Sequence, residues 1–173
     1  MVLLLVAVFA GAGTIHYQTP RLGAFAAEFH ARIEGLGAAP PPGGVVVTGE
    51  GQVFSGGVDF KAVPTYSADQ KARMVGHINA AITALYALPT ATVAAVNGHA
   101  IGGAFVVMLA CDVRLAADTG AKLGLTEVTA GIPYPAGPME VVRAEIEPSY
   151  RRHLVLSGAI IDARTAYARG VVD

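Results

Sequence analysis

The sequence has few of the residues that mark disulfide-stabilised or metal-binding proteins. It contains one cysteine, Cys111, so an internal disulfide is impossible and a reducing, cytoplasmic compartment is expected. Cys111 lies within the apolar run VVMLACDV, which is typical of a buried structural thiol and not of a nucleophile. The five histidines form no HExxH motif and no paired spacing, so we expect no metal site.

Charged residues are also scarce, at 14% of the chain, and the 12 basic and 13 acidic side chains nearly balance. No basic run is present that could follow a phosphate backbone, so a nucleic-acid partner is not expected. The apolar start MVLLLVAVFAGAG resembles a signal peptide, but it lacks a positively charged region and is far too short to span a membrane. Its β-branched and large aliphatic residues favour a buried strand over 2–9, and no membrane partner is expected.

Apolar residues are abundant, at 53% of 173 positions, together with 21 glycines. A chain of this length suits one domain, over 1–173, that buries about 70% of its unfolded surface. Strand-like segments alternate with segments of helical spacing, so the predicted class is α/β. Strands are predicted over 45–48, 92–96, 113–116 and 122–125, and helices over 19–36, 67–88 and 104–111 and from 138 onward. The predicted N-caps of three helices are Ser67, Ser149 and Asp162.

Two glycine-rich segments each follow a predicted strand, FSGGVDF at 54–60 and NGHAIGGA at 97–104. Glycine clusters are often ordinary turns, but small residues also let a ligand approach the main chain closely. The second segment opens a helix, whose first amides have no intrahelical partner. Two amides that converge on one oxygen would form an oxyanion hole. A nicotinamide site is disfavoured, because GAGTIH has His16 where the dinucleotide fingerprint needs a third glycine.

Three separated segments carry a more specific pattern than the turns alone. They are VVVTGEGQVFSGGVDFKAV, TATVAAVNGHAIGGAFVVMLACDVRLAADTGAKLGLTEVTAGIPYP and LSGAIIDARTAYARGVVD, and they run in this order over 45–173. These segments closely resemble the enoyl-CoA hydratase/isomerase, or crotonase, family. The resemblance implies a crotonase-like spiral of repeated ββα units, with a C-terminal helical region that is shortened here. It also implies an acyl-CoA thioester as substrate, no cofactor beyond the coenzyme A of that substrate, and a homotrimer or hexamer.

The resemblance also assigns roles to individual residues. Val58 and Gly103 match the two amide donors of the family's oxyanion hole. The positions that match coenzyme A contacts of the family are Gly56, Val58, Phe60, Lys61 and Gly102. Lys61 could meet a phosphate as a point charge, or it could equally be a solvated surface lysine.

The acid–base residues separate the branches of the family. Hydratases use two glutamates, and this sequence has Val106 at one of those positions and Glu127, in GLTE, at the other. A valine cannot deprotonate water, but one carboxylate suffices to move a proton between two carbons. The pattern therefore resembles the single-glutamate Δ3,Δ2-enoyl-CoA isomerases, and isomerisation is favoured over hydration. An apolar setting would raise the pKa of Glu127, although an ordinary exposed carboxylate at a strand end is the alternative.

Two more residues are candidates for the wall of the acyl pocket. Tyr134 stands where many hydratases have glycine, which implies a reshaped pocket, and Glu140 follows IPYPAG as a second candidate acid–base group. Hydration, hydrolysis or another crotonase-type reaction is the alternative activity. A further alternative is a truncated, non-catalytic protein that binds coenzyme A or only pairs with other subunits. Fatty-acid β-oxidation is the expected pathway.

Overall fold

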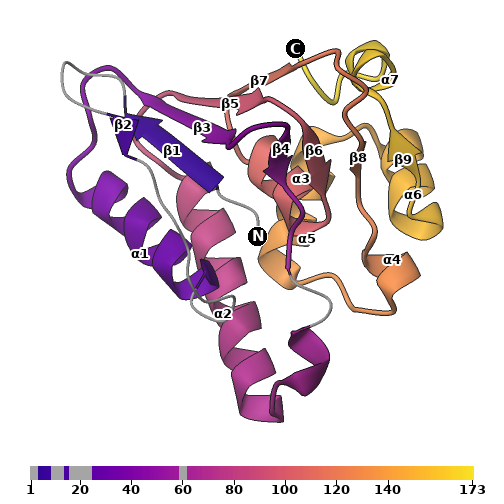
Figure 1. Ribbon diagram of the computed structural model, residues 1–173, viewed down its shortest axis with the longest axis horizontal. Coiled ribbons are helices and arrows are strands. Elements are labelled where there is room, and N and C mark those ends of the chain that lie inside the picture. The colour runs from indigo at the N-terminus through magenta and orange to yellow at the C-terminus, as the bar shows by residue number, and fades with distance from the viewer. Residues whose placement is uncertain (1–3, 9–13, 16–24, 59–61) are drawn as a thin grey trace.

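The chain forms two β-sheets with helices packed against them, as the computed structural model shows (Figure 1). The structure describes residues 4–8, 14–15, 25–58 and 62–173. The larger sheet has the strand order β2-β1-β3-β5-β7, and the smaller sheet has the order β4-β6-β8-β9. The strands are β1 (Leu4–Val8), β2 (Thr14–Ile15), β3 (Val45–Gly49), β4 (Val53–Ser55), β5 (Thr92–Val96), β6 (His99–Ile101), β7 (Val113–Ala116), β8 (Leu123–Gly124) and β9 (Ile160–Ile161). The helices are α1 (Phe25–Ala38), the 3-10 helix η1 (Val63–Thr65), α2 (Ala68–Tyr86), α3 (Gly103–Leu109), α4 (Glu127–Ala130), α5 (Ala136–Glu145), α6 (Pro148–Ser157) and α7 (Ala163–Ala168).

Three consecutive ββα units make up the centre of this architecture. The first is β3, β4 and α2, the second is β5, β6 and α3, and the third is β7, β8 and α4. In each unit the first strand belongs to the larger sheet and the second strand to the smaller one. The first strands pair in parallel with one another, and so do the second strands. The predicted α/β class and the predicted spiral of ββα units are therefore confirmed.

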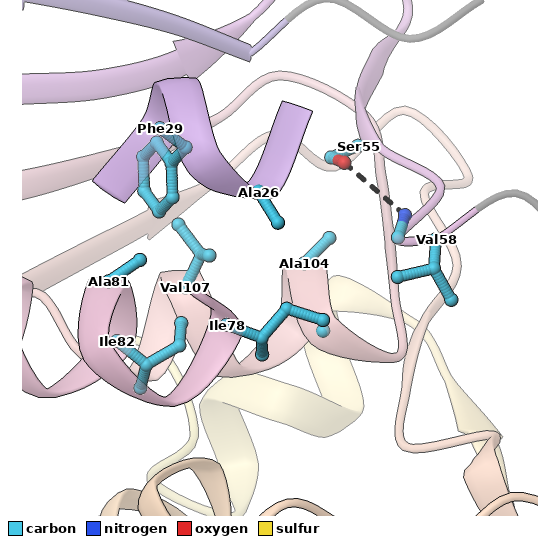
Figure 2. A pocket seen from close by; sticks show the side chains of 11 residues that line it. Ala26, Phe29, Ser55, Val58, Ile78, Ala81, Ile82, Ala104 and Val107 are labelled. Carbon is cyan, nitrogen blue, oxygen red and sulfur yellow. Dashed lines mark hydrogen bonds between the residues drawn. The ribbon is translucent and has the colours of Figure 1, made fainter. Parts of the chain in front are cut away.

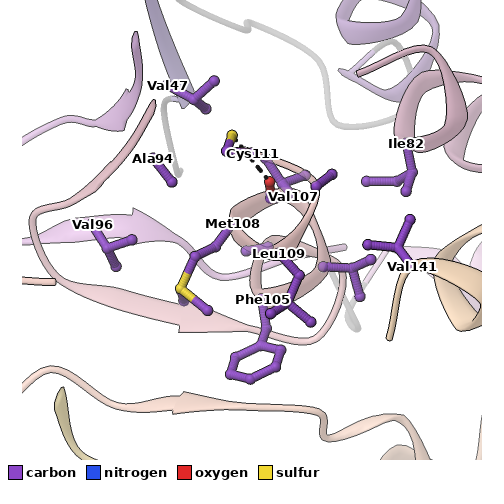
Figure 3. Packing of buried hydrophobic residues seen from close by; sticks show 14 of the residues in the cluster. Val47, Ile82, Ala94, Val96, Phe105, Val107, Met108, Leu109, Cys111 and Val141 are labelled. Atoms are coloured by element: carbon purple, nitrogen blue, oxygen red, sulfur yellow. Dashed lines mark hydrogen bonds between the residues drawn. The ribbon is translucent and has the colours of Figure 1, made fainter. Parts of the chain in front are cut away.

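The apolar helix α3 lies in the middle of the hydrophobic core. Every residue from Ala104 to Leu109 is buried. Figure 3 shows Phe105 and Met108 of this helix in a cluster that also contains Val96 of β5 and Val141 of α5. Full burial of a side chain of this kind stabilises a fold by about 1.5–3 kcal/mol. Because α3 begins directly after Gly102, this packing fixes the place of the second glycine-rich turn.

Two of the predicted helix caps are confirmed. Ser67 Oγ accepts a hydrogen bond from the Gln70 amide at 3.2 Å, and Gln70 Oε1 accepts one from the Ser67 amide at 2.8 Å. This reciprocal pair satisfies two amides at the start of α2. Asp162 Oδ1 accepts a hydrogen bond from the Thr165 amide at 2.7 Å, at the start of α7. The predicted start of the first helix, at 19–20, lies outside the described residues.

The predicted cap at Ser149 is wrong, because α6 begins earlier and Glu147 is its N-cap. Glu147 Oε2 accepts hydrogen bonds from the amides of Ser149 and Tyr150, each at 3.0 Å. The Ser149 hydroxyl donates to the same oxygen. Pro148 takes the first helical position, where the missing amide has no intrahelical partner to lose. The helix therefore starts at the proline, and the glutamate before it caps the first turn.

Candidate active site

The pairing of β4 with β6 brings the two glycine-rich turns together. The strands are parallel, with Val53 opposite His99 and Ser55 opposite Ala100. Both strands therefore leave the smaller sheet in the same direction, and the turns that follow them lie side by side. Gly57 lies at the point of contact, with φ of 77°, and a β-carbon added to it would lie 2.7 Å from the Ile101 carbonyl oxygen. The same β-carbon would lie 3.5 Å from the Gly103 nitrogen, so only glycine fits between the turns.

The main-chain amides at this contact differ in their availability. The Gly102 amide donates a hydrogen bond to the Gly124 carbonyl at 2.8 Å, so it is already used within the smaller sheet. The Gly57 amide donates to Ser55 Oγ at 3.3 Å. The amides of Val58 and Gly103 have no acceptor among the described residues. Of the residues predicted to bind substrate here, Val58 and Gly103 can therefore donate to a ligand, whereas the Gly102 amide cannot without losing its partner.

Glu127 is the first residue of α4, and only 6% of its surface is exposed. Its Oε1 would lie 3.3 Å from a β-carbon added to Gly102, so the carboxyl group lies against the second glycine-rich turn. No described residue donates a hydrogen bond to its Oε2. Burial raises the pKa of Glu127 above the ordinary value of 4.5, and nearby backbone amides oppose this shift. The alternative of an exposed strand-end carboxylate is therefore wrong.

Tyr134 lies close enough to Glu127 for the two side chains to interact electrostatically. Burial raises the pKa of Tyr134 to about 12, and the negative charge of Glu127 contributes to this shift. The Tyr134 hydroxyl donates a hydrogen bond to the Val155 carbonyl at 3.2 Å, which ties the segment after α4 to α6. Tyr134 therefore lies near the carboxyl group, but it does not line the apolar cavity of this site.

Two other predicted pocket residues lie away from a cavity. Val106 is 1% exposed and belongs to the hydrophobic core, so no second carboxyl group accompanies Glu127 from that position. Glu140 lies on the exposed face of α5 and pairs with Arg143, with Oε1 and Nη1 2.6 Å apart. The structure therefore does not bring Glu140 to the site. Gly56 is half-buried in the first turn, and Phe60 and Lys61 lie outside the described residues.

An apolar cavity opens beside the two amides (Figure 2). Its walls come from α1, α2, α3 and the first glycine-rich turn. Both Val58 and Gly103 line the cavity, and Figure 2 shows Val58 at the end of the group beside Ser55. The residues that line it are Ala26, Phe29, Ser55, Gly57, Val58, Ile78, Ala81, Ile82, Gly103, Ala104 and Val107. The Gly102–Gly103 turn therefore touches both the Glu127 carboxyl group and this cavity.

Sequence reasoning missed most of the cavity wall. Phe29 of α1 and Ile78 and Ile82 of α2 recur at helical spacing, which indicates an apolar helix face but not whether that face meets core or cavity. Ser55 was also missed as a site residue. It is 5% exposed, and its Oγ accepts the hydrogen bond from the Gly57 amide described above. The signal available in the sequence was a serine directly before a glycine pair.

Neither a metal cluster nor a membrane helix is found in the part of the chain that the structure describes. Over those residues no group of three or more histidine, cysteine or acidic side chains could hold a metal ion. His30 and His77 do approach each other across α1 and α2, with Nδ1 atoms 3.5 Å apart. None of the helices described is both long enough and apolar enough to cross a bilayer.

A ββα spiral that places two glycine-rich turns side by side, next to a buried carboxyl group, defines a crotonase-type protein. The chain belongs to the enoyl-CoA hydratase/isomerase family, whose model matches residues 23–173. It is 36% identical over 139 residues to the protein named "Probable enoyl-CoA hydratase EchA17" of Mycobacterium tuberculosis, covering 80% of this chain and 52% of that protein. It is 36% identical over 122 residues to the human mitochondrial methylglutaconyl-CoA hydratase, covering 70% of this chain and 35% of that protein.

Solved structures give the same result. An enoyl-CoA hydratase from Bacillus anthracis matches with a TM-score of 0.78 and 31% identity, over 86% of this chain and 58% of that one. DspI of Pseudomonas aeruginosa matches with a TM-score of 0.77 and 28% identity, over 85% of this chain and 60% of that one. The chain thus spans about half the length of the curated relatives it matches, 52% in the case of EchA17.

Proposed function

We propose that this protein isomerises 3-enoyl-CoA thioesters to 2-enoyl-CoA thioesters by proton transfer through Glu127. The amides of Val58 and Gly103 would donate hydrogen bonds to the thioester oxygen. Removal of a proton from carbon 2 makes a dienolate, whose negative charge collects on that oxygen. Donors already aimed at the oxygen stabilise this charge more than they stabilise the neutral thioester, which lowers the barrier.

Glu127 then completes the reaction with the same proton. Its carboxylate takes the proton from carbon 2 and becomes a neutral acid. It returns the proton to carbon 4, and the double bond moves from between carbons 3 and 4 to between carbons 2 and 3. No atom is gained or lost, so the mechanism requires no cofactor beyond the coenzyme A of the substrate.

The observation that carries this proposal is the buried carboxyl group of Glu127 with no second carboxyl group at Val106. Hydration needs one group to take a proton from water and a group to give one to carbon 2. Isomerisation needs one group that acts first as a base and then as an acid. The pKa of that group should therefore lie near the working pH. The raised pKa of Glu127 moves its proton affinity in that direction.

The test is turnover of 3-hexenoyl-CoA by the unaltered protein and by Glu127→Gln. We expect the variant to lose at least about a hundredfold in kcat, because general acid–base catalysis contributes roughly 10²–10⁴. Its dissociation constant for hexanoyl-CoA should stay within about threefold, because the amides and the cavity remain. Unchanged turnover would remove Glu127 from the mechanism. The matched control is Glu140→Gln, which removes an exposed carboxyl group outside the site and should leave kcat unchanged.

Enoyl-CoA hydration is the second candidate, and the names of the two relatives described above favour it. In that case Glu127 would activate a water for addition to carbon 3, with the two amides in the same role. The two reactions differ in product, since hydration of crotonyl-CoA removes the conjugated double bond and isomerisation of 3-hexenoyl-CoA creates one. We expect loss of conjugation from crotonyl-CoA to be slower than isomerisation by at least about tenfold.

The absence of catalysis is the third possibility, in which the chain only binds coenzyme A or pairs with other subunits. A ligand that binds the folded protein raises its melting temperature by mass action. Hexanoyl-CoA should therefore raise the melting temperature of Glu127→Gln as much as that of the unaltered protein. Binding without turnover in the unaltered protein would support the non-catalytic alternative.

A further inference from the structure

The side chains that line the cavity beside the two amides are almost all apolar. Figure 2 shows Ala26 and Phe29 of α1 facing Ile78, Ala81 and Ile82 of α2 across it. Val58 lies at one end of the group, and Phe29 lies at the other with Ala81 and Ile82. Phe29 is only 8% exposed, and Ala81 and Ile82 are 1% and 2% exposed. These three side chains are therefore closely packed at the end of the group away from Val58.

Its volume limits what can enter. The cavity measures about 60 Å³. An engineered apolar cavity of roughly 150 Å³ holds one benzene molecule of six carbons. By that proportion this cavity holds about two or three carbons. A polar or charged tail would lose its hydration there without gaining a partner, because the walls beyond the turns offer only apolar side chains.

We propose that the chain selects enoyl thioesters with short acyl groups, and that Phe29 and Ala81 set the length limit. The inference rests on the proposed function, because it places the thioester oxygen at the amides of Val58 and Gly103. Carbons 1 to 4 then lie at the reacting centre, and the rest of the acyl chain enters the cavity. With two or three carbons accommodated there, the preferred acyl group has about six or seven carbons in all.

Substitutions at Phe29 and Ala81 change the volume of the cavity in opposite directions. Phe29→Ala removes the side chain at the far end and should let a longer tail pass. Ala81→Val adds two methyl groups, about as much as the cavity holds, and should exclude a six-carbon tail while still admitting crotonyl and butyryl groups. Phe29→Leu is a second, smaller enlargement that removes fewer buried atoms. Leu36→Ala is the matched control, because Leu36 lies on the same helix, is 9% exposed and does not line the cavity.

The experiment measures dissociation constants for butyryl-, hexanoyl- and decanoyl-CoA by titration calorimetry, and kcat/KM for 3-enoyl-CoA substrates of six and ten carbons. In the unaltered protein we expect decanoyl-CoA to bind at least tenfold more weakly than hexanoyl-CoA, with a similar ratio in kcat/KM. Phe29→Ala and Phe29→Leu should reduce this ratio to threefold or less, whereas Leu36→Ala should leave it unchanged. Ala81→Val should weaken hexanoyl-CoA binding at least tenfold and butyryl-CoA binding by less than threefold.

The outcomes distinguish a failure of this inference from a failure of the function on which it rests. Equal binding of the six- and ten-carbon thioesters, or an equal effect of Phe29→Ala and Leu36→Ala, would overturn the length limit and leave isomerisation standing. The predicted length dependence in binding, without turnover, would support the length limit and contradict isomerisation. If none of the three saturated thioesters binds, the thioester function fails and the length limit fails with it.

Discussion

Glu127 is an ionisable group in a setting that suits its neutral form. It is buried against Gly102, its Oε2 meets no donor among the described residues, and burial raises its pKa. Removing a carboxylate from water is unfavourable unless hydrogen bonds replace the lost hydration. The folded state therefore disfavours ionisation of Glu127, which is a stability cost at the neutral pH where a base must act.

The stability of Glu127→Gln should therefore exceed that of the unaltered protein at neutral pH. The sign follows from the linkage between proton binding and folding. A group whose pKa is raised in the folded state stabilises that state fully at a pH below its pKa in the unfolded state. This stabilisation is lost as the pH rises through the pKa in the folded state. Glutamine imitates the neutral acid and has no such loss. We expect a higher melting temperature for the variant at pH 7–8, by about 2–4 °C for each kcal/mol, and a difference that shrinks towards pH 4. A variant that is less stable at pH 8 would contradict the buried, unpaired state of the carboxyl group.

Sequence reasoning could identify Glu127 but not its setting. GLTE marks the position by resemblance, yet burial depends on how α4 packs against α6 and the glycine-rich turn, which lie far apart in the sequence. The availability of the amides is also a tertiary property. Gly102 and Gly103 are adjacent and chemically identical, and only the pairing with Gly124 shows that one amide is used and the other is not.

The two glycine-rich turns work as one element because β4 and β6 hold them in register. Gly57 fills the space between them, where its missing side chain allows the close approach to Ile101. Gly51 has a similar backbone conformation, with φ of 62° against 77°, but a β-carbon there would meet nothing within 4 Å. Alanine substitutions at Gly51 and Gly57 can therefore be compared. Both include the energetic cost of the backbone conformation, but only the one at Gly57 includes the cost of forcing the turns apart.

Gly57→Ala should strongly reduce activity, whereas Gly51→Ala should not. Both variants place an L-residue in the left-handed region, at about 1–2 kcal/mol. Gly57→Ala must also displace the Ile101 carbonyl, which moves the Gly103 amide away from that of Val58. A misplacement of about 1 Å can reduce turnover by roughly 100-fold, so we expect at least that loss in kcat for Gly57→Ala. Equal kcat values for the two variants would show that the contact between the turns does not position the amides.

Elements with a local signal were predictable from the sequence, including the short strands β7 and β8, and several other short elements were not. The strand β5 matches its predicted span, and Ser67 caps α2 as expected, because apolar runs and capping residues are local signals. The short strands β4, β6 and β9 escaped prediction, since two or three residues show no periodicity. Yet β4 and β6 place both amide donors. The part of the fold that matters most for the site is therefore the part with the weakest local signal.

Arg114 of β7 is a buried cation that connects the larger sheet to the helices. Its Nη1 donates to Glu145 Oε2 at 2.8 Å, and it also donates to the carbonyls of Leu109 and Cys111 at 3.3 and 3.4 Å. Glu145 Oε1 in turn accepts the Tyr86 hydroxyl at 2.8 Å. These contacts connect β7 to the ends of α3, α5 and α2, so they hold the walls of the cavity to the sheet that supports them.

Arg114→Ala should destabilise the whole molecule far more than Arg143→Ala. Removing a buried partner leaves Glu145 without its counter-ion, which costs about 3 kcal/mol or more in comparable pairs. Arg143 and Glu140 have side chains 59% and 69% exposed, and exposed pairs contribute about 0–1 kcal/mol. Urea unfolding of the two variants checks the difference. Similar free energies of unfolding would contradict the role of Arg114 as a connection between the sheet and the helices.

The most direct test of the central claim follows the proton itself. 3-Hexenoyl-CoA carrying deuterium at carbon 2 is incubated with the unaltered protein in ordinary water, and the product is analysed by mass spectrometry and NMR. If Glu127 is the single, buried acid–base group, deuterium removed from carbon 2 appears at carbon 4 of 2-hexenoyl-CoA, and Glu127→Gln makes no such product. A 3-hydroxyacyl product, or 2-hexenoyl-CoA with no deuterium at carbon 4, would contradict the account.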